Sequence, residues 1–135
     1  MAITWFRGQY DFLSNFYENP VTVNGITYRN SEAAFQAQKC PERANEFSDL
    51  TGKEAKKLGR KVNLREDWNE ARISVMEEVL KAKFKDETLK QKLIATGDNM
   101  LVEGNNWGDR YWGVVNGNGK NNLGLLLMKI REDIK

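Results

Sequence analysis

The first regular pattern of apolar and polar residues along the chain predicts a β-hairpin at about residues 21–29. Two β-rich runs, VTV and ITYR, flank Asn24-Gly25, and this dipeptide is strongly favoured in two-residue hairpin turns. We expect the segment ITWF, near the start of the chain, to pair with this hairpin.

Beyond the hairpin, helical spacing of apolar residues predicts helices at about residues 31–39, 52–60, 68–84, 87–96 and 122–134. The first three start with capping signals: Asn30 or Ser31 for the first, Thr51 and Glu54 for the second, and Asp67 and Glu70 for the third. The spacing in the third helix places Trp68 on a core-facing stripe. These elements indicate a mainly α (α+β) fold, a compact single domain of residues 1–135 with a small N-terminal β-hairpin.

Residues 101–122, between the last two helices, are rich in Gly, Asn and Trp and keep no sustained period. A loop of this length in so small a domain is more often functional than idle. We therefore expect it to carry part of a site.

The chain contains no His and a single Cys, Cys40. These counts exclude a Ser-His-Asp triad, a Cys-His dyad, a His-ligated metal, an intrachain disulfide and a thiolate zinc cage. Any catalysis must use carboxylates, amines, hydroxyls, amides or the backbone, and we expect neither a metal nor a cofactor. Cys40 itself is interpreted as an inert buried thiol.

The 21 basic and 19 acidic residues give a net charge of +2, which is too balanced to indicate a protein held on nucleic acid by phosphate neutralisation. The basic cluster at residues 53–61 is interpreted as a solvated helix face. No apolar run approaches the length of a membrane span, and the start of the chain does not resemble a signal peptide. With a free Cys, these features favour a cytoplasmic protein without membrane contact.

The first candidate site is the predicted helix SEAAFQAQK. At 100° per residue, Glu32, Gln36 and Lys39 share one face, where a carboxylate, an amide and an amine could orient a water, bind a hydroxyl and hold an anion. The alternative is an exposed Glu/Lys helix face.

Two loops supply the other candidates. Asp109 lies between Trp107 and Trp112, and aromatic faces beside a carboxylate suit a nucleobase or a sugar; alternatively the two Trp plug the core and Asp109 caps a turn. In GQYDFLSNFYENP, Ser14 and Asn15 could bind a ribose or a phosphate, or could simply form a turn.

The run NGNGKNN is not a Walker A motif, because Val114 replaces its first Gly and Asn121 its Ser or Thr. A Gly-rich segment that opens a helix can still present N–H groups to an anion. Lys120 is therefore kept as a candidate for substrate binding.

Taken together, five segments resemble the YbiA-like family, also called the NADAR domain. They are YDFLSNFY, VNGITYRNSEAAFQAQK, DWNEARISVMEEVLKAKF, LVEGNNWGDRYWG and GNGKNNLGLLLMKIRE, which occur in the family's order over nearly the whole chain. The resemblance implies a compact, mostly helical fold and an N-glycosidase. It also implies a substrate that is either a phosphorylated riboflavin-pathway intermediate or ADP-ribose attached to guanine, including in nucleic acid.

The resemblance places the family's functional carboxylate on Glu32, its functional tryptophans on Trp68 and Trp112, and its acidic position before YWG on Asp109. One departure is that many relatives have His directly after the motif Glu, where this chain has Ala33. Substrate preference can differ with it.

The resulting hypothesis is metal-independent hydrolysis at the anomeric carbon of a ribosyl N-glycoside, through an oxocarbenium-like ribose. Glu32 or Asp109 would stabilise the developing charge, and one of them would activate the water. Trp112, and Trp107 or Trp68, would hold the base, while Lys39 and Asn15 would contact phosphate and ribose hydroxyls. The alternative is a non-catalytic module that binds ADP-ribose or another nucleotide.

Overall fold

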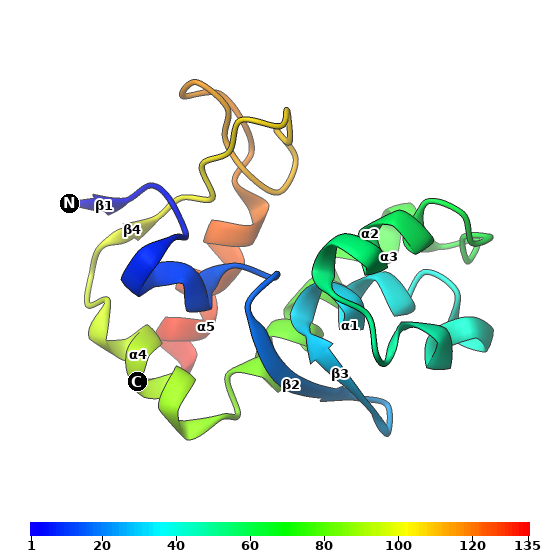
Figure 1. Ribbon diagram of the computed structural model, residues 1–135. Coiled ribbons are helices and arrows are strands. Elements are labelled where there is room, and N and C mark those ends of the chain that lie inside the picture. Colours follow the sequence, from blue (N-terminus) through cyan, green and yellow to red (C-terminus); the bar gives the residue numbers. More distant parts are fainter. The chain divides into compact units, whose positions relative to one another are not determined.

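The computed structural model describes residues 1–135, and their contacts divide them into two compact units. Unit 1 contains Met1–Ser14 and Asp86–Lys135, and unit 2 contains Asn15–Lys85. Helices predominate and the strands form two two-stranded sheets (Figure 1), so the predicted mainly α (α+β) class is confirmed. The single-domain organisation of residues 1–135 stays a prediction.

The predicted hairpin is present in unit 2. Strand β2 (Glu18–Val23) pairs antiparallel with β3 (Ile26–Asn30). The turn residues Asn24 and Gly25 have φ angles of 51° and 81°, the left-handed backbone that such turns require. The hairpin begins earlier than predicted, and its register shifts between Glu18 and Val21, where Pro20 has no N–H to donate to the ladder.

The helices of unit 2 are α1 (Ser31–Ala37), α2 (Gly52–Gly59) and α3 (Trp68–Lys83), with a 3₁₀ helix, η2 (Pro41–Phe47), between the first two. Two predicted caps are confirmed: the Asn30 side chain accepts from Ala33 N at 2.7 Å, and Thr51 and Glu54 form a complete capping box. The third is wrong. The carboxylate of Asp67 instead accepts two hydrogen bonds from Arg65, at 2.6 and 2.9 Å, and α3 starts without a side-chain cap.

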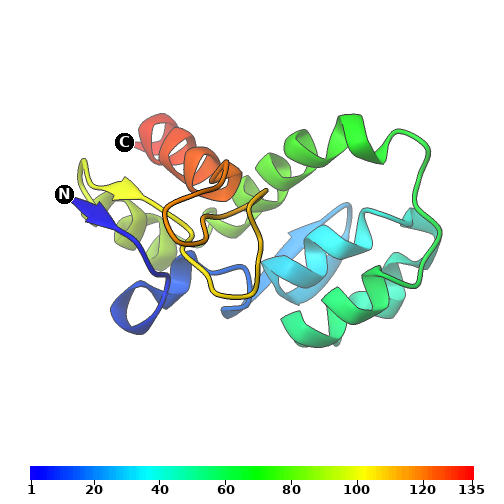
Figure 2. The same ribbon diagram turned by 90° about the horizontal axis from the view of Figure 1, so that it is seen from above.

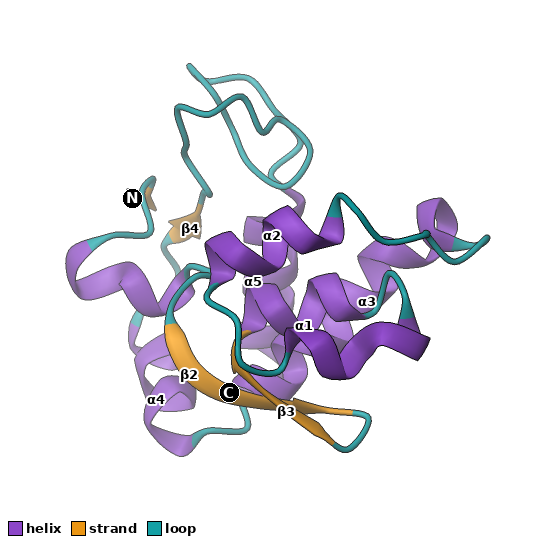
Figure 3. Cartoon of the chain, turned by 45° about the vertical axis from the view of Figure 1, so that its right-hand side comes forward, coloured by secondary structure: helices purple, strands orange, loops and turns teal.

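Helix α1 is the centre of unit 2. It contacts both hairpin strands, η2, α2 and α3, and Figures 1 and 3 show it flanked by the hairpin on one side and by α2 on the other. Every residue from 31 to 38 is consequently buried. The small side chains of Ala33, Ala34 and Ala37 are fully buried and allow this close approach.

Unit 1 contains a short parallel sheet, the 3₁₀ helix η1 (Gly8–Leu13), and helices α4 (Glu87–Ala95) and α5 (Asn122–Ile134). The sheet pairs β1 (Ala2–Ile3) with β4 (Met100–Leu101). The expected pairing of ITWF with the hairpin is therefore wrong, because the backbone of residues 1–4 hydrogen-bonds with residues 100–104. The buried side chains of Ile3 and Leu101 lie at adjacent sheet positions.

The predicted long loop is also confirmed. Figure 2 shows the chain running from β4 to α5 without a helix between them; residues 102–121 contain only isolated bridges, such as Gly104 with Val114. None of the helices has both the length and the apolar character needed to cross a bilayer.

Candidate functional site

Two residues of the predicted polar stripe, Glu32 and Gln36, lie on α1 and are buried, whereas α1 ends at Ala37 and Lys39 lies in the turn that follows. The amide Nε2 of Gln36 donates to Oε2 of Glu32 at 2.6 Å, as expected for side chains one helical turn apart. Glu32 is 8% exposed and Gln36 is 5% exposed. The alternative of an exposed Glu/Lys face is therefore wrong for these two residues. A buried carboxylate with a specific hydrogen-bond partner is a candidate for a functional group.

Asn15 fixes the first turn of α1, which carries Glu32. Its carbonyl accepts the backbone N–H of Glu32 at 2.9 Å, and its Oδ1 accepts from Ser31 Oγ at 2.9 Å. Its Nδ2 donates to Met76 Sδ on α3 at 3.6 Å. Asn15 thus connects the segment before the hairpin to two helices, a positioning role in addition to the predicted ribose contact.

Gln36 is held from the other side by α2. Its buried Oε1 has no hydrogen-bond partner and lies against Gly59, where an added Cβ would collide with this oxygen. Glycine at residue 59 therefore allows α2 to approach α1 closely. The packing leaves the Gln36 amide group little freedom to move away from Glu32.

Lys39 and Trp68 lie together at the other end of α1. The Lys39 ammonium is 6.0 Å from the centroid of the Trp68 ring, within reach of a cation–π interaction. The Trp68 ring packs on Phe35, with centroids 5.2 Å apart, and Trp68 is 6% exposed, as its core-facing stripe predicted. Burial lowers the pKa of Lys39; the Glu32 carboxylate opposes this shift, and Arg60 and Lys56 add to it.

Asp109, in the long loop of unit 1, organises a turn. Its Oδ1 accepts from the backbone N–H groups of Tyr111 at 3.0 Å and Trp112 at 2.9 Å. The side chain of Asn105 forms two hydrogen bonds with the Asp109 backbone: it accepts from the N–H at 3.0 Å and donates to the carbonyl at 2.9 Å. The turn-capping alternative is thus correct in its geometry.

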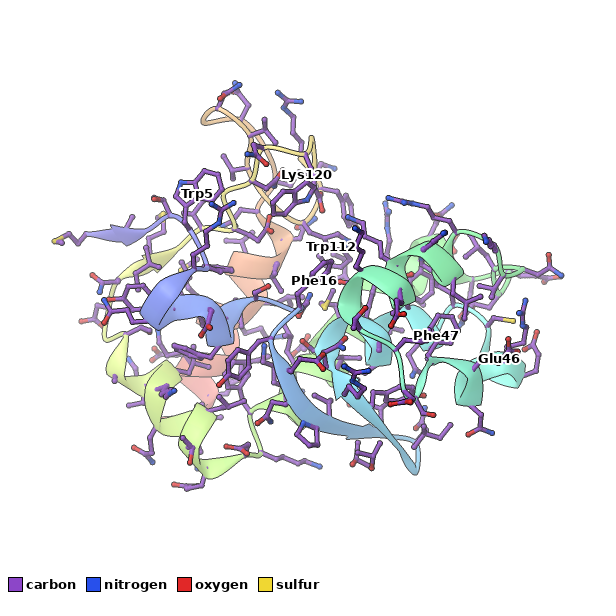
Figure 4. All side chains as sticks on the ribbon, in the orientation of Figure 1. Trp5, Phe16, Glu46, Phe47, Trp112 and Lys120 are labelled. Carbon is purple, nitrogen blue, oxygen red and sulfur yellow. The ribbon has the colours of Figure 1, made fainter.

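The tryptophans of this loop do not plug the core, contrary to the other half of that alternative. Trp107 is 56% exposed, and Trp112 is half-buried with its ring edge-on to Tyr111 at 5.0 Å between centroids. Lys120 is exposed, with its ammonium 5.6 Å from the Tyr111 centroid. Trp112 and Lys120 are labelled in Figure 4. The loop therefore presents aromatic surface beside a cation, which suits a nucleobase.

The expectation that NGNGKNN presents N–H groups to an anion is wrong. Backbone N–H groups at the start of α5 donate instead to carbonyls of the same loop. The four hydrogen bonds run from Lys120 to Arg110, from Asn121 to Gly113, from Asn122 to Tyr111 and from Leu123 to Trp112. Asn121 adds to this network, accepting from Glu103 N and donating to Leu101 O, each at 2.9 Å. Asn105 and Asn121 are structural residues that the sequence signalled only through the Asn-rich composition of the loop.

The remaining candidates have local roles. The Ser14 backbone N–H donates to Asp11 O at the end of η1. Cys40 is buried and its thiol donates to Glu42 at 3.0 Å, which fits the predicted inert thiol. Nowhere in residues 1–135 do three or more His, Cys, Asp or Glu side chains gather in a way that could hold a metal ion.

The ten candidate residues thus fall into two sets. Unit 2 holds Asn15, Glu32, Gln36, Lys39 and Trp68, and unit 1 holds Ser14, Trp107, Asp109, Trp112 and Lys120. The first set gathers around α1, and Asp109 and Trp112 of the second set share one turn. The roles of all ten in the reaction stay predictions.

The chain is similar to known proteins over nearly its whole length. Residues 5–135 match the NADAR domain family. N-glycosidase YbiA of Escherichia coli (strain K12) is 39% identical over 132 residues, covering 93% of this chain and 82% of that protein. An N-glycosidase of Nostoc punctiforme is 32% identical over 136 residues, covering 93% and 86%.

Two further comparisons concern a longer relative and a solved structure. A riboflavin biosynthesis protein of Vibrio vulnificus is 36% identical over 131 residues; this chain spans only 35% of that protein's length. The NMR structure of E. coli YbiA superposes with a TM-score of 0.83 at 36% identity, covering 99% of this chain and 86% of that one. The predicted YbiA-like fold is confirmed.

Proposed function

The chain belongs to the NADAR domain family, and from that premise we propose that it hydrolyses the N-glycosidic bond of a phosphorylated ribosyl substrate. It is a glycosidase that acts on N-glycosyl bonds, because its curated relatives are named N-glycosidases. The substrate is proposed to be ADP-ribosylated guanine, free or in nucleic acid, or a phosphorylated riboflavin-pathway intermediate. The name of the Vibrio vulnificus relative favours the second class.

The observation that carries the proposal is the buried Glu32 carboxylate, hydrogen-bonded to Gln36. Cleavage of the C–N bond at the anomeric carbon leaves positive charge on the ribose, and a nearby carboxylate stabilises it. The base departs with the bonding electrons, and a water adds to this carbon and gives its proton to Glu32. Glu32 then returns that proton to the departed base through solvent, so that one water is consumed for each bond cleaved. Burial strengthens the attraction between the carboxylate and the ribose cation.

The other residues are assigned roles that fit their contacts. Trp68, packed on Phe35, offers an aromatic wall, and the Lys39 ammonium beside it binds the anionic part of the substrate. Asp109, whose carboxylate accepts the backbone N–H of Trp112, is assigned the role of holding the turn of its own loop. Glu32, not Asp109, is thus proposed as the base that activates water.

The test is to incubate the protein with ADP-ribosylated guanine and, separately, with a phosphorylated ribosylaminopyrimidine. Release of free ADP-ribose or ribose phosphate supports the proposal, and the preferred substrate identifies the class. Binding of both without turnover would make the chain a non-catalytic nucleotide-binding module and overturn it. A cytoplasmic setting, which the free thiol of Cys40 favours, is part of the proposal.

A further inference from the structure

Three cationic side chains of unit 2, Lys39, Lys56 and Arg60, lie close enough together for their charges to interact. Lys56 lies on α2, and Arg60 is the residue that caps its C-terminal end. The two are four residues apart and therefore lie on one face of the helix. The close packing at Gly59 brings α2 onto α1, which ends next to Lys39. The charges of Arg60 and Lys56 both act on the Lys39 ammonium. Positive charge from two helices therefore converges on one place.

These three cationic side chains lack the carboxylate partners that other cations of unit 2 have. Arg29, Arg43 and Arg65 each form an ion pair, with Glu18, Glu46 and Asp67 at 2.8, 2.7 and 2.6 Å. Lys39, Lys56 and Arg60 form no ion pair with a carboxylate of unit 2. Glu32 attracts Lys39 but is itself bonded to Gln36.

The dipole of α2 explains only part of the cluster. Basic residues near a helix C-terminus are favoured by its partial negative charge, which accounts for Lys56 and Lys57 in the last turn. It does not account for Lys39, which comes from the end of α1 and is half-buried beside two like charges. Like charges placed together at a cost to the folded state point to an anionic ligand that neutralises them.

We propose that Lys39, Lys56 and Arg60 form the subsite for the 5′-phosphoryl group of the ribosyl substrate. The Arg60 guanidinium can bind phosphate oxygens in a bidentate manner, and the two ammonium groups act as point charges. The inference rests on the proposed function, because it places the phosphate next to the carboxylate that acts at the anomeric carbon. It also reinterprets two members of a basic cluster that the sequence alone indicated to be a solvated helix face.

The shared chemistry of both substrate classes is a phosphoryl group on the ribose 5′ oxygen. A phosphorylated pyrimidine intermediate carries it as a monoester, and ADP-ribose carries it as one half of a pyrophosphate. Ribose 5-phosphate and ADP-ribose are therefore the two probes, and unphosphorylated ribose is the reference ligand.

The experiment measures binding of these three ligands by calorimetry to the unaltered protein, to Lys56→Ala/Arg60→Ala, and to the control Lys57→Ala. Lys57 is exposed in the same helical turn, so its removal changes the net charge and the helix terminus without touching the subsite. We expect the double variant to bind ribose 5-phosphate at least about 10-fold more weakly, since each charge-assisted contact contributes more than a neutral one. The control should bind it as the unaltered protein does.

An equal loss for ADP-ribose would assign the subsite to both sources, and a loss for ribose 5-phosphate alone would assign it to the monoester. The inference is overturned if the double variant binds both probes as tightly as the control, or if the unaltered protein binds neither better than ribose. The readout needs no turnover: phosphate binding that depends on Lys56 and Arg60, in a protein that hydrolyses neither substrate, would remove the proposed function and keep the subsite.

Discussion

Helix α1 and the loop of residues 102–121 each carry a candidate catalytic carboxylate, yet the two carboxylates have different partners. Glu32 is buried and accepts from a side-chain amide, that of Gln36. Asp109 accepts from two backbone N–H groups and closes a turn. The Asp109 carboxylate therefore has a structural role in its turn, whereas the hydrogen bond from Gln36 holds Glu32 in place on α1 without closing a turn.

The largest expected effect comes from Glu32→Gln. The change removes the charge and the proton acceptor but keeps the shape, so kcat should fall at least about 100-fold while the circular dichroism spectrum and the unfolding transition stay close to those of the unaltered protein. Single-turnover hydrolysis of the preferred substrate is the measurement. Retained activity in a folded Glu32→Gln protein would remove Glu32 from the mechanism.

Gly59→Ala tests whether α2 holds the Glu32–Gln36 pair in place. The added Cβ would collide with Gln36 Oε1, so the free energy of unfolding should fall by about 1–3 kcal/mol, with a loss of activity as Gln36 shifts. Urea denaturation gives the stability. The double variant Gln36→Ala/Gly59→Ala should be less destabilised than the sum of the single variants; simple additivity would contradict the contact.

Asp109 can be tested with two substitutions that separate turn from charge. Asp109→Asn keeps the Oδ1 acceptor, so stability should hardly change, and activity should fall less than 10-fold. Asp109→Ala removes both hydrogen bonds and should lower the free energy of unfolding by about 1–2 kcal/mol. If Asp109→Asn instead costs as much kcat as Glu32→Gln, both carboxylates take part in the reaction.

Lys39→Met should weaken binding of ribose 5-phosphate without destabilising the protein at neutral pH. Burial lowers the pKa of Lys39 below its ordinary 10.5, so the unfolded chain holds this proton more tightly than the folded one. Burying the charged ammonium lowers the free energy of unfolding, and this loss is fully present at a pH below the pKa of Lys39 in the folded protein. The free energy of unfolding therefore rises as the pH increases from that pKa toward 10.5, the ordinary value. In urea denaturation across this pH range, the free energy of unfolding of the variant should rise less than that of the unaltered protein. A variant that is less stable at neutral pH and shows the same rise would contradict the prediction.

Trp107→Ala should have the smallest effect on stability, below about 0.5 kcal/mol, because the side chain is exposed. As a comparison, Trp68→Ala in the core of unit 2 should lower the free energy of unfolding by about 3–5 kcal/mol. Thermal unfolding measures both variants. If Trp107 stacks on the base, its removal will raise KM and leave the melting temperature unchanged. Unchanged kinetics would exclude Trp107 from substrate binding.

Local signals account for what the sequence predicts well. The Asn24-Gly25 turn and the Thr51–Glu54 capping box depend on residues within four positions of each other, and both are present. The α1 stripe follows from helical geometry alone. The helices at residues 87–96 and 122–134 are likewise found as α4 and α5, with small differences at their ends.

Competition between partners and long-range contacts explain what the sequence does not predict. Asp67 has a suitable cap position, but a neighbouring guanidinium, that of Arg65, binds its carboxylate more strongly than a backbone N–H would. The β1–β4 pairing joins residues about a hundred positions apart, which no local pattern encodes. The 3₁₀ helices η1 and η2 lack the sustained period that marks an α-helix.

The same reasoning applies within the candidate site. Residue types on α1 indicated a carboxylate and an amide on one face, but not that Gly59 from another helix would confine the amide. In the loop, the spacing of Asp109 and the tryptophans is identical for a stacking site and for a capped turn. Only the hydrogen bonds to Tyr111 and Trp112 N–H distinguish the turn.

The packing of Cys40 makes the natural chain suitable for thiol-directed probes. Its hydrogen bond to Glu42 and its burial both raise the pKa of the thiol, and the protonated, enclosed sulfur reacts slowly with maleimides and iodoacetamides. A cysteine introduced at an exposed residue outside the candidate site, such as Lys57, would therefore be the rapidly labelled position. Fluorescent or spin labels can follow ligand binding there without first replacing the natural cysteine.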